Sequence, residues 1–190
     1  MTDKPLWVSF YTSDYAAHGD RLVASLERFA LPYHVARVPK RGDWHTTTRW
    51  KPEFIEWMRA ATGRRPLVWI DADAEVLREP VELRSVESVS AVEMPRTLRS
   101  CGRWMAGMVA VGGPDAGLFL ADWIDLCAEM PRTYAADSEP FSVLGERLIG
   151  GRRAVVSLPH EYGSIDGLWE HPDPVIVHHQ ASREMARGER

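Results

Sequence analysis

The chain has 190 residues, of which 45% are hydrophobic and 26% are charged. This composition is typical of a globular protein with a buried core and excludes global disorder. The formal net charge of −4 excludes a strongly basic surface of the kind that drives nonspecific nucleic-acid binding. Two cysteines are too few for a disulfide-stapled secreted domain, and no apolar run reaches the roughly 18 residues of a membrane span. The N-terminal MTDKPLWVSF does not resemble a secretory signal, so we expect a cytoplasmic protein.

The first half of the chain alternates predicted strands and helices. Residues 6–11 are aromatic and β-branched, which predicts a strand. A helix with Asp20 as its N-cap is expected next, and residues 33–38 predict a second strand. Pro52 marks the start of another helix. The continuously apolar residues 67–70 then predict a strand that is buried on both faces, as in the middle of a parallel sheet.

The second half continues the same alternation. Its predicted strands are residues 89–92, 108–111, 154–158 and 175–177. The Gly-Gly-Pro-Asp sequence at 112–115 signals the start of a helix, and a shorter helix follows Pro140. Strands that alternate with helices predict an α/β fold with a mostly parallel central sheet flanked by helices. We expect one domain over residues 1–180 and a charged tail over residues 181–190.

A pair of carboxylates follows the most apolar predicted strand. Asp71-Ala72-Asp73 comes directly after residues 67–70 and is the only Asp-x-Asp triplet in the sequence. Ligands of open α/β sheets bind at the carboxyl ends of the strands. The two side chains can converge there if the chain turns as it leaves the sheet, and oxygen ligands at such an edge suit Mg²⁺ or Mn²⁺. A solvated acidic turn is the alternative interpretation.

Residues 68–74, with the sequence VWIDADA, resemble the strand and metal motif of nucleotide-diphospho-sugar transferases with the GT-A fold. Other segments resemble this superfamily in the order in which it uses them. These segments are residues 10–12, 24–26, 48–55, 104–108 and 158–179. The resemblance covers most of the chain, from about residue 7 to residue 180. It implies a Rossmann-like GT-A fold and a glycosyltransferase that takes its sugar from a nucleoside-diphosphate sugar.

The resemblance also implies a metal site. Asp71 and Asp73 are expected to bind the cation, and a histidine near the C-terminus is expected to complete the site. His178 and His179 are the candidates, and at most one should reach the metal because neighbouring strand residues point in opposite directions. An imidazole beside carboxylates favours Mn²⁺ over Mg²⁺. The alternative is that both histidines are ordinary residues at the end of a strand.

Further residues are implied to bind the nucleotide sugar. Tyr11 is placed to stack on a base, and Asp14 to accept a hydrogen bond from uracil or ribose. Lys51 is placed to contact the diphosphate or a sugar hydroxyl as a point charge. Core packing is the alternative for Tyr11, and a solvated lysine is the alternative for Lys51. The predicted donor-binding residues are Tyr11, Thr12, Asp14, Lys51, Asp71 and Gly107.

The catalytic carboxylate is less closely specified. Inversion of the anomeric centre requires a base that deprotonates the acceptor hydroxyl, whereas retention needs no separate base. Many relatives have an Asp-Gln or Asp-Glu pair where this chain has Asp137-Ser138-Glu139-Pro140, so the alignment is open by a position or two. Asp137, Glu139 and Asp166 are therefore the predicted catalytic candidates.

The acceptor and the reaction class leave alternatives open. We expect the acceptor to be a saccharide, a protein or a modified DNA base. A large acceptor such as a polysaccharide, a protein or a modified nucleic acid suits so small a domain, and the alternative is that a partner subunit completes the site. The basic residues that could contact a phosphate-bearing acceptor are Arg49, Lys51, Arg96, Arg99 and Arg103, with scattered solvated arginines as the alternative. A nucleotidyltransferase or nucleotide hydrolase is less favoured because no Gly-rich phosphate loop follows the first strand. A non-catalytic nucleotide-sugar-binding module is the third possibility.

Overall fold

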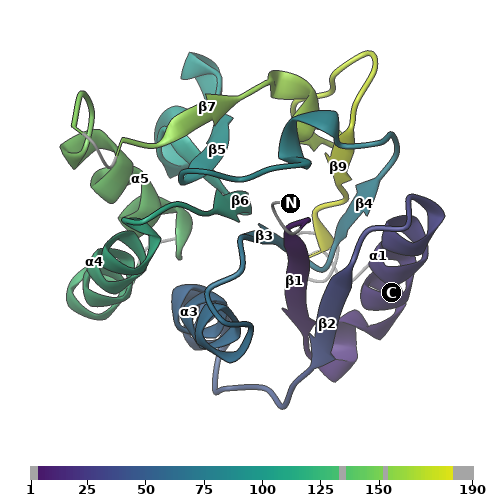
Figure 1. Ribbon diagram of the computed structural model, residues 1–190, viewed down its shortest axis with the longest axis horizontal. Coiled ribbons are helices and arrows are strands. Elements are labelled where there is room, and N and C mark those ends of the chain that lie inside the picture. The colour runs from purple at the N-terminus through teal and green to yellow at the C-terminus, as the bar shows by residue number, and fades with distance from the viewer. Residues whose placement is uncertain (1–3, 133–135, 152–153, 182–190) are drawn as a thin grey trace.

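A six-stranded sheet forms the centre of the computed structural model, which describes residues 4–132, 136–151 and 154–181 (Figure 1). The strand order is β2-β1-β3-β6-β5-β7. These strands are β1 (Leu6–Tyr11), β2 (Tyr33–Arg37), β3 (Leu67–Ile70), β5 (Ser90–Glu93), β6 (Trp104–Val111) and β7 (Val156–Leu158). β1 pairs in parallel with β2 and β3, and β5 pairs in parallel with β7. β6 runs against both of its neighbours, so the expected mostly parallel sheet is confirmed with one reversed strand.

Helices cover both faces of this sheet because the inner strands are apolar on both sides. Trp7 and Val68 pack in a core with α1, whereas Val8 and Trp69 pack in a second core with α3, α4 and α5. The helices are α1 (Ala16–Arg28), α2 (Trp44–Arg49), α3 (Lys51–Ala61), α4 (Ala116–Glu129) and α5 (Ser138–Arg147). All four residues of β3 are buried, as the apolar run predicts.

A small second sheet lies beside the end of β3. It consists of β4 (Ala74–Val76), β9 (Ile176–His178) and β8 (Ser164–Ile165), with β9 in the middle. β4 and β9 are antiparallel and place Ala74 opposite His178. Figure 1 shows the two strands side by side, although they are about a hundred residues apart in sequence. This sheet therefore joins the C-terminal segment to the Asp71–Asp73 turn.

Several predicted boundaries differ from the observed ones. α1 begins at Ala16 rather than after Asp20, because a 3₁₀ turn leads straight into it. α2 was not predicted; its N-cap Asp43 accepts a hydrogen bond from the backbone N–H of Thr46 at 2.8 Å. α5 starts at Ser138, ahead of Pro140. The 3₁₀ helices are Ser13–Tyr15, Val81–Leu83, Arg96–Cys101 and His160–Tyr162.

Two further expectations concern the ends and the membrane. The charged tail predicted over residues 181–190 lies, apart from Ala181, outside the described residues. Among the described helices, none has both the length and the apolar character that crossing a membrane would require.

Candidate metal centre

Three side chains with metal-binding atoms converge at the carboxyl end of β3. Ligand atoms of Asp71, Asp73 and His178 lie within 4.8 Å of one another. The chain turns immediately after β3, with the Ala74 N–H donating to the Asp71 carbonyl at 3.0 Å, and this turn brings the two carboxylates together. The pairing of β4 with β9 then places His178 beside them. The sequence left the choice between two histidines open, and the structure brings His178 to the carboxylates.

The imidazole of His178 is in the chemical state that a metal ligand requires. Its side chain is buried, and its Nε2 has no hydrogen-bond partner within the described parts of the chain. Burial lowers the pKa of His178 to about 4, and the charge of Lys51 adds to this effect while Asp71 opposes it. The ring is therefore neutral at neutral pH, as metal binding requires. This buried nitrogen and the two neighbouring carboxylates together form a set of ligands that suits Mn²⁺, and also Mg²⁺.

The surroundings of Asp73 disfavour its charged form, and a bound cation would stabilise that form. Burial, followed by the negative charge of Asp71, raises the pKa of Asp73 to about 6. Its Oδ2 accepts a hydrogen bond from the Ala181 N–H at 3.0 Å, and its carbonyl accepts one from the His179 N–H at 2.9 Å. Two carboxylates placed this close repel each other unless a positive charge lies between them.

Lys51 supplies a fixed positive charge next to the three candidate ligands. It is the first residue of α3 and is only 3% exposed, so the solvated alternative is wrong. Its Nζ lies 2.8 Å from Asp71 Oδ1 and 2.5 Å from Asp137 Oδ2, and it donates to the Ala106 carbonyl at 3.0 Å. Burial by itself would lower the pKa of Lys51, but the carboxylates of Asp137 and Asp71 outweigh it and raise that pKa. The ammonium therefore stays charged and links Asp137 to the centre.

Gly107 in β6 leaves room at the centre. A Cβ at this position would lie 3.0 Å from His178 Cε1 and 3.1 Å from Asp71 Oδ2, closer than side chains normally approach. The Gly107 carbonyl also accepts a hydrogen bond from the Asp71 N–H at 2.8 Å. The absence of a side chain thus keeps the space between His178 and Asp71 open.

The predicted nucleoside-binding residues lie at the last residue of β1 and directly after it, at the same end of the sheet as Asp71. The Tyr11 ring packs against α1 at Gly19, where an added Cβ would lie 2.7 Å from ring carbons. Thr12 is buried at the start of the first 3₁₀ turn. Asp14 is exposed and forms an ion pair with Lys40 at 3.1 Å.

Tyr15, the next residue in this turn, was missed in the sequence. Burial, followed by the charges of Asp73 and Asp71, raises the pKa of Tyr15 to about 12. The hydroxyl of Tyr15 is therefore within electrostatic range of both aspartates. The only signal for Tyr15 in the sequence was its position directly after Asp14.

The three catalytic candidates occupy different surroundings. Asp137 is buried and paired with Lys51, within the network that reaches Asp71. Glu139 is half-buried in the first turn of α5. Asp166 is half-exposed, and its Oδ2 lies 2.5 Å from Nδ1 of His179, whose Nε2 lies 3.4 Å from Glu75. His179 therefore lies against the carboxylates of Asp166 and Glu75 rather than those of Asp71 and Asp73.

Arg49 is a structural residue in this fold. Its guanidinium donates to four backbone carbonyls and is therefore largely occupied by contacts within the fold. The acceptors are the carbonyls of Cys127, Met130, Pro131 and Ala136, at distances of 2.5–3.2 Å. These hydrogen bonds favour a structural role for Arg49 over the anion contact that the sequence suggested. Arg49 instead holds the end of α4 and the residue before Asp137.

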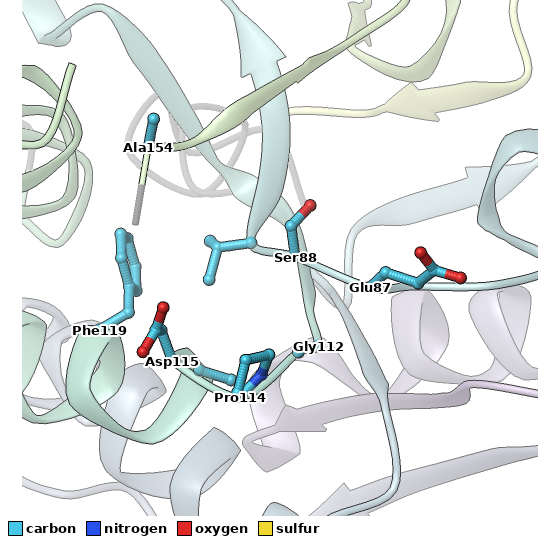
Figure 2. A pocket seen from close by; sticks show the side chains of 10 residues that line it. Glu87, Ser88, Gly112, Pro114, Asp115, Phe119 and Ala154 are labelled. Atoms are coloured by element: carbon cyan, nitrogen blue, oxygen red, sulfur yellow. The ribbon is translucent and has the colours of Figure 1, made fainter. Parts of the chain in front are cut away.

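A hollow of about 110 Å³ lies at the other end of the sheet (Figure 2). Figure 2 shows Glu87, Gly112, Asp115 and Phe119 around it. β6 runs antiparallel to β3 and pairs Val111 with Leu67, so the hollow beside Gly112 lies near the start of β3. It is separated from Asp71 by the length of that strand.

Comparisons with known proteins identify solved structures with this fold. No family model matches the sequence, and no curated protein matches it. The crystal structure of a glycosyltransferase involved in the glycosylation of the major capsid of PBCV-1 superposes with a TM-score of 0.72 at 13% identity, over 98% of this chain and 100% of that chain. The apo structure of the bifunctional glycosyltransferase WbbM superposes with a TM-score of 0.59 at 14% identity, over 94% of this chain and 46% of that chain. The chain therefore has the fold of these glycosyltransferases, which confirms the fold that the sequence resemblance implied.

Proposed function

We propose that this chain is a metal-dependent glycosyltransferase that moves a sugar from a nucleoside-diphosphate sugar to an acceptor. The observation that carries the proposal is the convergence of Asp71, Asp73 and His178 at the carboxyl end of β3. This is the edge at which α/β sheets bind ligands, in a fold shared with glycosyltransferases. The donor set of two carboxylates and one imidazole supports Mn²⁺, with Mg²⁺ as the second choice.

The buried charges around the centre suit the departure of a nucleoside diphosphate. When bound, a divalent cation would neutralise the negative charge that develops on this leaving group. Lys51 adds a second positive charge beside Asp71, in surroundings where burial reduces screening by water. Tyr11, Thr12 and Asp14 are proposed to bind the nucleoside, because they lie at the same end of the sheet as Asp71.

The acceptor side of the reaction is proposed from the placement of the carboxylates. Asp137 is paired with the buried Lys51, so we assign it the role of a fixed negative charge that orients Lys51 and the donor sugar. If transfer inverts the anomeric centre, Glu139 or Asp166 is the base, and Asp166 is the more exposed of the two. The acceptor classes to test are a polysaccharide, a protein and a modified nucleic acid; the capsid glycosylation named for the solved neighbour makes a protein acceptor one of the first.

The test combines nucleotide binding with turnover. Wild-type protein is screened by thermal shift against nucleoside diphosphates and nucleotide sugars with and without Mn²⁺, and donor hydrolysis is followed by chromatography. A ligand at about 100 times its Kd adds about 2.7 kcal/mol, which raises the Tm of a protein of this size by roughly 5–11 °C. We expect a rise that requires both Mn²⁺ and one class of nucleotide.

Two variants separate the alternatives. Asp73→Asn should abolish the metal-dependent rise and the release of nucleoside diphosphate, while Asp115→Asn at the opposite end of the sheet should leave both unchanged. Release of pyrophosphate or inorganic phosphate would support a nucleotidyltransferase or a nucleotide hydrolase instead. Binding without turnover of any donor, with every acceptor class tested, would support a non-catalytic module.

A further inference from the structure

The two oxygens of the Asp71 carboxylate have different surroundings. Oδ1 accepts a hydrogen bond from Trp69 Nε1 at 2.8 Å and lies 2.8 Å from Lys51 Nζ. Oδ2 lies 3.1 Å from the position of a Cβ on Gly107, a position that is itself 3.0 Å from His178 Cε1. One oxygen is therefore held by two donors, and the other lies on the side of the His178 ring.

Trp69 is held in the position from which it donates to only one of the two Asp71 oxygens. Side chains alternate along a strand, so Trp69 and Asp71, two residues apart, project toward the same face at the end of β3. The indole is only 2% exposed, and its ring packs against Phe10 and Phe54 with centroid distances of 5.2 Å and 6.0 Å. These contacts fix the orientation of the indole, and its N–H finds its acceptor in Asp71. A phenylalanine would keep an aromatic ring in this core, although a smaller one, and could not donate this hydrogen bond.

Resting on the proposed function, we propose that Trp69 is a positioning residue for the metal centre, which together with Lys51 turns Asp71 so that Oδ2 alone faces the cation. Asp71 then binds through one oxygen. Hydrogen-bond partners behind a metal ligand fix its orientation and its affinity in this way. Lys51 contributes charge as well as a hydrogen bond, whereas Trp69 contributes direction without charge. Replacing Trp69 therefore tests orientation with the net charge of the centre unchanged.

The test is a titration with Mn²⁺ alone, in which free Mn²⁺ is counted by electron paramagnetic resonance. Trp69→Phe is compared with the wild type and with Trp7→Phe, which removes an indole of matched burial from the core on the α1 side of the sheet. Thermal unfolding of both variants checks the fold. We expect Trp69→Phe to weaken Mn²⁺ binding by about tenfold or more, and Trp7→Phe to leave it within twofold of the wild type.

Each outcome decides between the two proposals. Equal Mn²⁺ affinity in the wild type and Trp69→Phe would overturn the role of Trp69 and leave the metal centre standing. Failure of the wild type to bind Mn²⁺ would overturn the metal-dependent function and this inference with it.

A measurement on the wild type covers the case in which Trp69→Phe does not fold. The protein has eight tryptophans, and ¹⁵N labelling gives each indole N–H its own signal. Because Trp69 donates to a metal ligand from a buried position, we expect one exchange-protected indole signal to shift as diamagnetic Mg²⁺ saturates the centre. If no protected indole signal shifts at saturation, Trp69 does not act on the metal ligand.

Discussion

The two ends of the central sheet differ in where they keep their charged groups. At the carboxyl end of β3, the side chains of Lys51, Asp137 and His178 are all buried. At the other end, the hollow in Figure 2 has its carboxylates, Glu87 and Asp115, at least partly in contact with solvent. Burying charge costs free energy unless the charge is paired or binds a metal, so proteins rarely keep such groups without a use for them. Buried charge, rather than concavity, therefore distinguishes the end of the sheet at which we propose the metal centre.

The largest effect should come from removing one negative charge from the proposed metal centre. Asp73→Asn is expected to lower Mn²⁺ affinity by about 100-fold, because it replaces one of two charged oxygen ligands by a neutral one. The measurement is a Mn²⁺ titration at neutral pH. Asp115→Asn makes the same chemical change at the other end of the sheet and is expected to bind Mn²⁺ as the wild type does. Loss of Mn²⁺ affinity in both variants would show that the two ends of the sheet do not differ in metal binding.

The next effect is on stability. Lys51→Met leaves Asp137 buried without its partner, and we expect it to lower the free energy of unfolding by about 3–5 kcal/mol. Urea unfolding measures this change. Arg84→Met removes a cation from an ion pair with Glu79 in which both side chains are more than half exposed, and about 0–1 kcal/mol is expected. Similar losses in the two variants would show that Asp137 finds another partner or reaches water.

A smaller effect should follow from filling the space at Gly107. Gly107→Ala places a methyl group 3.0 Å from His178 and 3.1 Å from Asp71, so these ligands must shift, and Mn²⁺ affinity should fall by about tenfold. Gly117→Ala in α4 is the control, since the group it meets is the flexible end of Arg59. That control should leave Mn²⁺ binding unchanged and stabilise the helix by about 0.5–1 kcal/mol. Unchanged affinity in Gly107→Ala would mean that the cation binds elsewhere.

The smallest effect is a dependence on pH. Asp73 must lose its proton to bind a cation, and its pKa is raised to about 6 by burial and by Asp71. We expect Mn²⁺ affinity to be flat above about pH 7 and to fall toward tenfold per unit below about pH 6. His178, with its pKa lowered to about 4, should not contribute in this range. Titrations from pH 8 to pH 5 test this, and a fall that begins well above pH 7 would contradict it.

The parts of the fold that depend on local pattern were predictable. The apolar run of β3, the Asp-x-Asp turn and the paired histidines are all visible in the sequence and lie where the site forms. What could not be predicted depends on pairing between distant segments. β4 has only three residues and no pattern of its own, yet its register with β9 selects His178 over His179.

The same limit applies to the basic residues. Arg49 and Lys51 look alike in sequence, two cations at the start of a helix. Arg49 binds backbone carbonyls at the end of α4, and Lys51 binds two carboxylates that lie 20 and 86 residues further along the chain. Their roles follow from which groups the fold places opposite them, and that information is not local.

The most direct test of the central claim is the position of a bound Mn²⁺. Crystals grown with Mn²⁺ and a nucleoside diphosphate would show the ion by its anomalous scattering. We expect one strong peak between Asp71, Asp73 and His178, in contact with the diphosphate. A saturated Mn²⁺ peak elsewhere, or a nucleotide bound at this edge without any ion between these three residues, would contradict the account.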